Sequence, residues 1–139
     1  MMILAALPYL YFLSCLCVIG FQFALIFGAP WGRITQGGTH EGALPLSGRI
    51  AAGISVLILL GMAFAITSAA GWWPQWPLWA SWVALAVQGL SCVANWITPS
   101  QPERRLWGPI TSLMLVTAGA IVFSTLACFL LIEYTKWCR

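Results

Sequence analysis

The sequence predicts an all-α membrane protein, with four transmembrane helices in an up-down bundle and two polar loops on one face. Hydrophobic residues make up 61% of the chain and charged residues 6%, whereas a soluble domain carries about 25% charged residues. The charges cluster and leave three tracts without Asp, Glu, Lys, Arg or His, namely residues 1–32, 50–102 and 106–132. Because a charge at mid-bilayer costs about 2.5–3.5 kcal/mol, we expect these tracts to lie in lipid.

The first span is expected over residues 3–27. A helix needs about 20 apolar residues to cross about 30 Å of hydrocarbon, and this tract exceeds that length. It lacks the basic beginning of a cleaved signal peptide, and its apolar part is longer than such a peptide has. Pro8 lies near its start, where a helix tolerates proline best. We therefore expect a retained transmembrane helix.

The second charge-free tract is long enough for two spans, expected over residues 50–70 and 78–96. Gly71, Pro74 and Pro77 interrupt it within the sequence AAGWWPQWPLWASW, because glycine and proline end one helix and start the next. Tryptophans crowd this break: Trp72, Trp73, Trp76, Trp79 and Trp82. Since the indole ring prefers the bilayer interface, we predict a tryptophan-rich turn at the membrane surface, with an aromatic ligand box as the alternative.

The fourth span is expected over residues 109–132, since Pro109 suits a first helical turn. Two spans then separate the polar loops, residues 28–49 and 98–108, so both loops lie on one side of the membrane. The basic residues of that side are Arg33, Arg49, Arg104 and Arg105, against Lys136 and Arg139 on the side of the termini. The positive-inside rule therefore predicts cytoplasmic loops.

The first loop holds the candidate catalytic residues, His40 and Glu41. Histidine titrates near neutral pH, so this pair could act as an acid and a base. A solvated surface pair is the alternative. Glycines and two flanking prolines make the loop both flexible and kinked, although it has no phosphate-binding G-x-x-x-x-G-K-[ST] motif. We expect it to fold back over the bundle and present polar groups to a ligand.

The second loop lies in the sequence NWITPSQPERRLWGP, residues 95–109. Glu103 suits the N-terminus of the following helix. Arg104 and Arg105 suit lipid headgroups, and an ion pair with Glu41 is the alternative. Asn95 lies near the end of the third span, where a buried amide needs partners. It either packs between helices or lines a small polar cavity.

Several classes of site find no support in the sequence. His40 and Glu41 are too few for a metal site, and the five cysteines lack paired spacing. The chain has no basic run for nucleic acid, and the spans have no charged residue to carry protons. The sequence identifies no cofactor and leaves open whether the protein is an enzyme.

The two loops together carry a pattern of short segments. The first loop contains, in order, GAPWG, QGG, G, LP and R, and the second contains N, S, PER and WGP. This pattern resembles a group of small bacterial integral membrane proteins of unknown function. The matching positions are 28–32, 36–38, 42, 44, 45, 49, 95, 100, 102–104 and 107–109. The resemblance implies a bacterial inner-membrane location and a four-helix layout, but no activity.

These observations leave three hypotheses for function. The first, which we favour, is binding of a small ligand or lipid headgroup at a cap formed by both loops. The residues expected to bind it are Trp31, Arg33, His40, Glu41, Arg49, Asn95, Glu103, Arg104 and Trp107. The second is an accessory or structural subunit of a larger membrane complex, and the third is an interface enzyme that uses His40 and Glu41. Membrane lipids are expected partners, and other subunits, including a second copy of the chain, stay open.

Overall fold

The fold is all-α. The computed structural model describes residues 2–137, with side chains over residues 6–131. Its helices are α1 (Met2–Ile26), α2 (Leu46–Ala69), α3 (Leu78–Ile97) and α4 (Gln101–Trp137). All four are long and apolar enough to cross a membrane. The predicted four-helix multi-pass architecture is confirmed.

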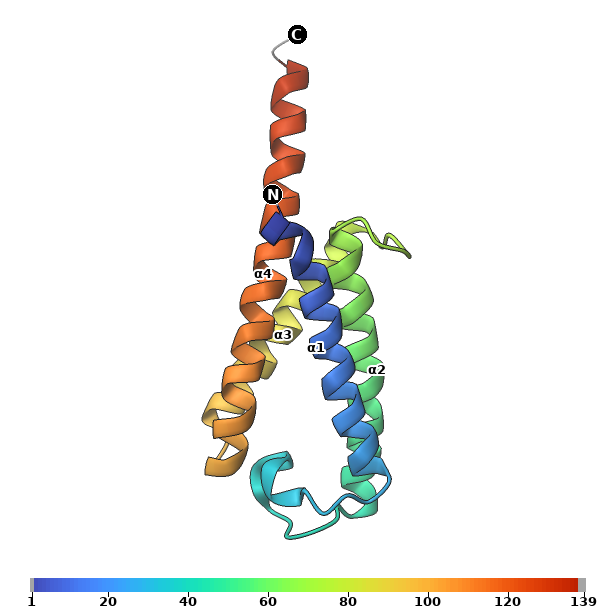
Figure 1. The fold of residues 1–139 in the computed structure, drawn as a ribbon, viewed down its shortest axis with the longest axis vertical. Helices are drawn as coiled ribbons and strands as arrows, with labels where there is room; N and C mark the ends of the chain where they lie inside the picture. Colours follow the sequence, from blue (N-terminus) through green and yellow to red (C-terminus); the bar gives the residue numbers. More distant parts are fainter. Residues whose placement is uncertain (1, 138–139) are drawn as a thin grey trace.

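The helices alternate in direction (Figure 1). We call the end with the α1–α2 segment and the α3–α4 turn the loop end, and the end with the α2–α3 turn the hairpin end. α1 packs mainly against α2, and α3 mainly against α4, with further contacts between the two pairs. Figure 1 shows these pairs close together toward the hairpin end and spread apart toward the loop end. The segment between α1 and α2 curls into the space between the loop-end parts of the two helix pairs (Figure 1).

The hydrophobic core lies in the half of the bundle nearer the hairpin. All four helices contribute buried side chains to it, among them Tyr11, Cys15, Met62, Ile66, Ala84, Met114, Ile121 and Val122. A second, smaller cluster of Leu25, Leu44 and Ala52 joins α1, α2 and the loop at the opposite end. Between these two clusters, the buried apolar side chains leave a cavity in the bundle.

The start of α4 differs from the sequence prediction, because the helix begins at Gln101 rather than at 109. Ser100 accepts a hydrogen bond from the Glu103 backbone N–H over 3.3 Å. The Ser100 side chain thus caps the N-terminus of α4, and Pro102 lies in the first turn, where a helix tolerates proline. The second polar loop therefore shrinks from the expected residues 98–108 to 98–100, and Pro109 lies inside the helix.

The start of α2 also differs, since the helix begins at Leu46 and not at 50. Pro45 precedes it in an extended conformation with φ of −64°, and the Arg49 backbone N–H donates to the Pro45 carbonyl over 3.1 Å. The Arg49 side chain bends back to donate from Nε to the Leu44 carbonyl over 3.0 Å. Because that side chain finds a partner at the helix end, its charge does not prevent the earlier start.

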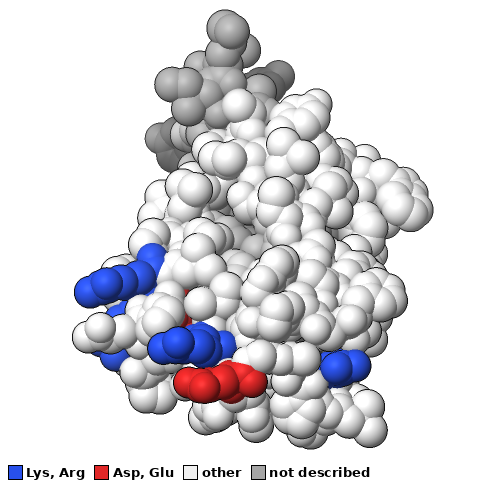
Figure 2. Space-filling view, turned by 60° about the horizontal axis from the view of Figure 1, so that its bottom comes forward, with Lys and Arg blue, Asp and Glu red and all other residues white. Residues whose placement is uncertain are grey.

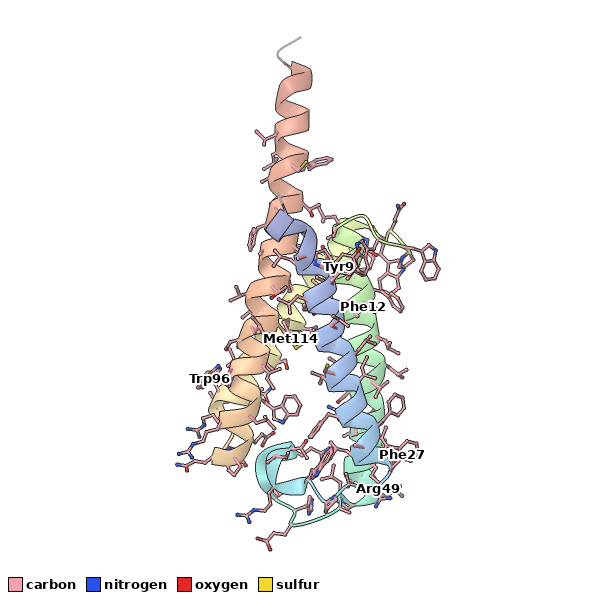
Figure 3. The ribbon with its side chains drawn as sticks, in the orientation of Figure 1. Tyr9, Phe12, Phe27, Arg49, Trp96 and Met114 are labelled. Atoms are coloured by element: carbon pink, nitrogen blue, oxygen red, sulfur yellow. The ribbon has the colours of Figure 1, made fainter. Side chains whose placement is uncertain are left out.

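The tryptophan-rich turn connects α2 and α3 through residues 70–77. Trp72 packs edge-on against Tyr9 of α1, with ring centroids 4.6 Å apart, and also contacts Phe12. Figure 3 shows both α1 residues near this turn. Trp73 is 80% exposed, as expected for a ring at the interface between lipid and water.

Candidate functional site

The loop between α1 and α2 is ordered and packs against the first turns of α4. It contains two short 3₁₀ turns, Gly32–Ile34 and Gln36–Gly38. The Gly32 N–H donates to the Gly42 carbonyl over 2.9 Å and closes the loop on itself. Both turns contact α4, as the expectation of an inward-folded loop requires.

Three hydrogen bonds fix the loop to one face of α4. The Gly37 backbone N–H donates to Glu103 Oε2 over 2.9 Å. Ser100 Oγ donates to the Arg33 carbonyl over 2.8 Å, and Trp107 Nε1 donates to the Ile34 carbonyl over 2.8 Å. Positions 100, 103 and 107 lie on one side of a helix because their spacing of three and four matches its turn. The early start of α4 is therefore what aligns these three partners.

Gly38 is a loop position that requires glycine for two reasons. Its φ is +67°, and a Cβ at this position would lie 2.6 Å from Ser100 Oγ and 3.0 Å from the Arg33 carbonyl oxygen. An L side chain would therefore be strained by the backbone and would also collide with the residues that hold the loop. The close approach of loop and helix depends on this glycine.

Aromatic rings join the loop, α1 and α4. Phe21 of α1 stacks on Trp31 with centroids 5.4 Å apart and an interplanar angle of 9°. The same ring meets Trp107 edge-on at 4.6 Å. The two tryptophans that sequence analysis assigned to the site thus share one partner, and Trp31 reinforces the loop from the side of α1.

Beneath the docked loop lies a cavity of about 530 Å³, within the usual range of about 300–1,000 Å³ for ligand pockets. All four helices and the loop line it. Its polar lining residues are Gln22, Thr35, Gln36, Ser55, Gln88, Ser91, Asn95, Glu103 and Thr111. Apolar side chains complete the wall, including Phe21, Met62, Trp107 and Met114. Figure 3 shows Met114 on the side of α4 that faces α1.

Three of the four amide side chains that line the cavity have a fixed orientation. Gln36 Nε2 donates to the Gly48 carbonyl over 2.8 Å, and Gln88 Nε2 donates to the Thr111 carbonyl over 3.2 Å. Asn95 Nδ2 donates to the Ser91 carbonyl over 2.8 Å. A carbonyl oxygen only accepts hydrogen bonds, so each amide must present its nitrogen to the backbone and keep its oxygen for other partners.

The cavity is open on one side, between the loop-end halves of α2 and α3. Four of its lining residues are themselves exposed on these two helices: Ala51, Ile58, Leu90 and Ala94. Leu90 is 72% exposed, which places it at the rim and not inside. In a bilayer this opening faces lipid.

The structure divides the predicted binding residues into two groups. Asn95, Glu103 and Trp107 line the cavity. Four others, namely Trp31, Arg33, His40 and Glu41, are exposed and are not among the cavity's lining residues. The charged side chains visible in Figure 2 gather at the loop end of the molecule. Within residues 6–131, Glu41 forms no ion pair with Arg104 or Arg105, the alternative raised by the sequence.

The remaining predicted residues, Arg49 and Arg104, bind backbone carbonyls. Arg49 Nε donates to the Leu44 carbonyl, and Figure 3 shows this residue beside α2, away from α4. Arg104 Nη2 donates to the Thr98 carbonyl over 2.7 Å, so it stabilises the short turn between α3 and α4. Both side chains therefore support the helix ends that surround the cavity.

The cavity residues that sequence analysis did not assign to the site include three glutamines, Gln22, Gln36 and Gln88. Gln88 is 2% exposed, and Tyr11 donates a hydrogen bond to its Oε1 over 3.4 Å. The indication was present, because Gln22 and Gln88 are isolated amides within tracts otherwise poor in strongly polar residues. A buried amide needs partners in lipid, so such residues mark polar interiors.

Fold and site together define a small multi-pass membrane protein with a cavity in which several polar side chains interrupt a mainly apolar wall. Comparison with protein-family models, curated proteins and solved structures found no match.

Proposed function

We propose that this membrane protein binds a small polar ligand in the cavity beneath the loop of residues 28–45. The observation that carries the proposal is the polar lining, with Glu103, Asn95 and Gln88 facing one cavity inside an apolar bundle. Convergent polar groups in an otherwise apolar pocket are typical of ligand sites. The docked loop supports the proposal further, because it covers the cavity at the membrane surface.

The proposal refines the favoured sequence hypothesis by moving the site inward. The ligand occupies the interior behind Glu103 and Trp107, while the exposed arginines remain at the surface. We place the protein in a bacterial inner membrane, as the resemblance implies, with the loop end in the cytoplasm. A C-terminal alkaline phosphatase fusion tests this orientation, because the termini then lie outside the cytoplasm and the fusion is active. An inactive fusion contradicts the orientation.

Methionine methyl NMR tests ligand binding directly. The chain has only four methionines, and two of them, Met62 and Met114, line the cavity. We expect members of a panel of small cationic, neutral and anionic solutes to shift these two signals saturably in protein solubilised in a non-ionic detergent. The signals are assigned with Met62→Leu and Met114→Leu.

A pair of variants on α3 provides the control. Ala94→Phe places a ring in the opening of the cavity, whereas Ala86→Phe adds the same ring at an exposed position outside the lining. Binding must weaken at least tenfold in Ala94→Phe and persist in Ala86→Phe. The proposed function is wrong when no panel member shifts the Met62 and Met114 signals, or when both variants bind like the wild type.

A further inference from the structure

We infer that the ligand of this cavity carries a primary ammonium group, with Glu103 as its counter-ion. The inference rests on the proposed function and adds the chemical class of the ligand. It follows from the charge of the cavity wall, from the hydrogen-bonding capacity that the wall leaves unused, and from the shape of the opening.

Glu103 supplies the only charge in the wall. It is 8% exposed, and no other lining residue within the described part of the chain is Asp, Glu, Lys, Arg or His. Both hydrogen bonds to its side chain come from neutral donors and end on Oε2, one from Gly37 N–H and one from Thr98 Oγ1 over 2.8 Å. Oε1 is left to accept from a ligand. A buried carboxylate without a cationic partner attracts a cation.

Three amide side chains of the wall keep an acceptor oxygen for a ligand, and each NH₂ group also retains a second N–H. Gln36, Gln88 and Asn95 each donate their NH₂ group to a backbone carbonyl. Their oxygens therefore remain toward other partners, and only that of Gln88 receives a hydrogen bond from a described side chain, the 3.4 Å contact from Tyr11. These oxygens can accept hydrogen bonds from a ligand that carries N–H groups.

Two of the four hydroxyl groups in the wall also act as acceptors toward a ligand. Ser55 Oγ donates to the Ala51 carbonyl over 2.9 Å, and Thr111 Oγ1 donates to the Trp107 carbonyl over 2.7 Å. Since a hydroxyl has one hydrogen, each of these groups keeps only lone pairs for a ligand. An ammonium group, with three N–H donors and one positive charge, satisfies both the carboxylate and the surrounding oxygens.

The rest of the wall suits an organic cation better than a metal ion. The described residues contain no group of three or more His, Cys, Asp or Glu side chains that could hold a metal. Phe21 and Trp107 line the cavity, and aromatic faces attract organic cations. The volume of about 530 Å³ leaves room for a carbon chain beside the ammonium group.

The opening between α2 and α3 admits two sources of this chemistry. A free amine can enter through this opening. The headgroup of phosphatidylethanolamine, which also carries a primary ammonium, can enter sideways past the exposed Ile58 and Leu90. Both sources place the same group beside Glu103, so the experiment must separate them.

Methyl NMR with three probes of equal length tests the class of ligand. Propylammonium is expected to shift the Met62 and Met114 signals saturably, and to bind at least tenfold more tightly than neutral propanol or anionic propionate. Equal or tighter binding of propanol or propionate overturns the ammonium assignment while leaving the proposed function intact. When no member of the wider panel binds, both proposals fail.

Two isosteric substitutions test the role of charge. Glu103→Gln keeps an acceptor for the Gly37 N–H but removes the charge, and it must weaken propylammonium binding at least tenfold. Gln22→Glu adds a second carboxylate to the wall and must tighten it severalfold. Glu41→Gln removes an exposed carboxylate outside the cavity and must leave affinity unchanged. Unchanged affinity in both Glu103→Gln and Gln22→Glu refutes the inference.

Nanodiscs distinguish the two sources. Phosphatidylcholine has a quaternary ammonium without N–H donors, so the cavity signals should match the unliganded state in discs made from it. With a headgroup as the ligand, added phosphatidylethanolamine shifts both signals toward their propylammonium-bound positions and weakens propylammonium binding. With a free amine as the ligand, phosphatidylethanolamine leaves both measurements unchanged. When phosphatidylcholine shifts both signals toward the propylammonium-bound positions as strongly as phosphatidylethanolamine does, N–H recognition is contradicted and the inference is overturned.

Discussion

The backbone N–H of Gly37 donates to Oε2 of Glu103 over 2.9 Å, across 66 residues of sequence. This bond joins the loop after α1 to the first turn of α4, and Thr98 Oγ1 donates to the same oxygen. One carboxylate therefore holds the loop, closes the α3–α4 turn and contributes the charge of the cavity. Its removal should affect stability as well as binding.

We expect Glu103→Ala to lower the free energy of unfolding by about 1.5–3 kcal/mol, the usual effect of losing hydrogen bonds to a charged group. The matched control, Glu41→Ala, removes an exposed carboxylate and should change it by less than about 0.5 kcal/mol. Unfolding in mixed SDS micelles measures both, and hydrogen exchange of the Gly37 amide should accelerate only in the first. Equal effects in the two variants would show that the Gly37 bond contributes nothing.

Gly38→Ala should release the loop from α4. The new Cβ collides with Ser100 Oγ and lies against the Arg33 carbonyl, in addition to the strain at a φ of +67°. Gly42→Ala is the control, because its φ of +93° gives strain but no atom lies within 4 Å of the added Cβ. Trypsin should cleave after Arg33 several times faster in Gly38→Ala than in Gly42→Ala. Similar rates in both variants contradict the docked arrangement.

Gly108→Ala should weaken the packing of α3 against α4. A Cβ at Gly108 would lie 3.0 Å from Cε2 of Trp96, whose indole N–H donates to Ser112 Oγ over 2.9 Å. We expect a loss of about 1–3 kcal/mol, typical of overpacking. Gly119→Ala adds the same methyl group in open space on the same helix and should be neutral or stabilising. Thermal unfolding followed by circular dichroism compares them, and an unchanged Tm in Gly108→Ala refutes the contact.

Tyr11 and Gln88 should be energetically coupled, because the tyrosine hydroxyl donates to the buried amide oxygen. A double-mutant cycle with Tyr11→Phe and Gln88→Leu isolates this bond. Interhelical hydrogen bonds in membranes average about 0.6 kcal/mol, and the 3.4 Å length indicates a value no larger. Additive losses, with a coupling of zero, would mean that the two groups do not bond in the bilayer.

The four spans were predictable because they depend on local properties. Charge-free tracts identify the membrane segments, and the Gly71 to Pro77 break separates α2 from α3 without knowledge of the packing. The start of α4 was also predictable in principle, since Ser100 and Glu103 have capping-box spacing. The expectation that Pro109 begins the helix gave too much weight to one proline.

The cavity could not be predicted in the same way. It depends on how far the α1–α2 pair lies from the α3–α4 pair at the loop end, and no sequence pattern specifies that separation. Asn95 was expected either to pack or to line a cavity, and only the assembled bundle shows that it lines one. Likewise, the exposure of His40 depends on which face the loop turns toward α4.

The length of α4 links the cavity to the bilayer. Its charge-free segment, residues 106–132, extends about 40 Å at about 1.5 Å per residue, whereas hydrocarbon is about 30 Å thick. This hydrophobic mismatch is relieved when the helix tilts, and a thicker bilayer requires less tilt. Membrane thickness therefore acts on the orientation of the helix that carries Glu103 and Trp107.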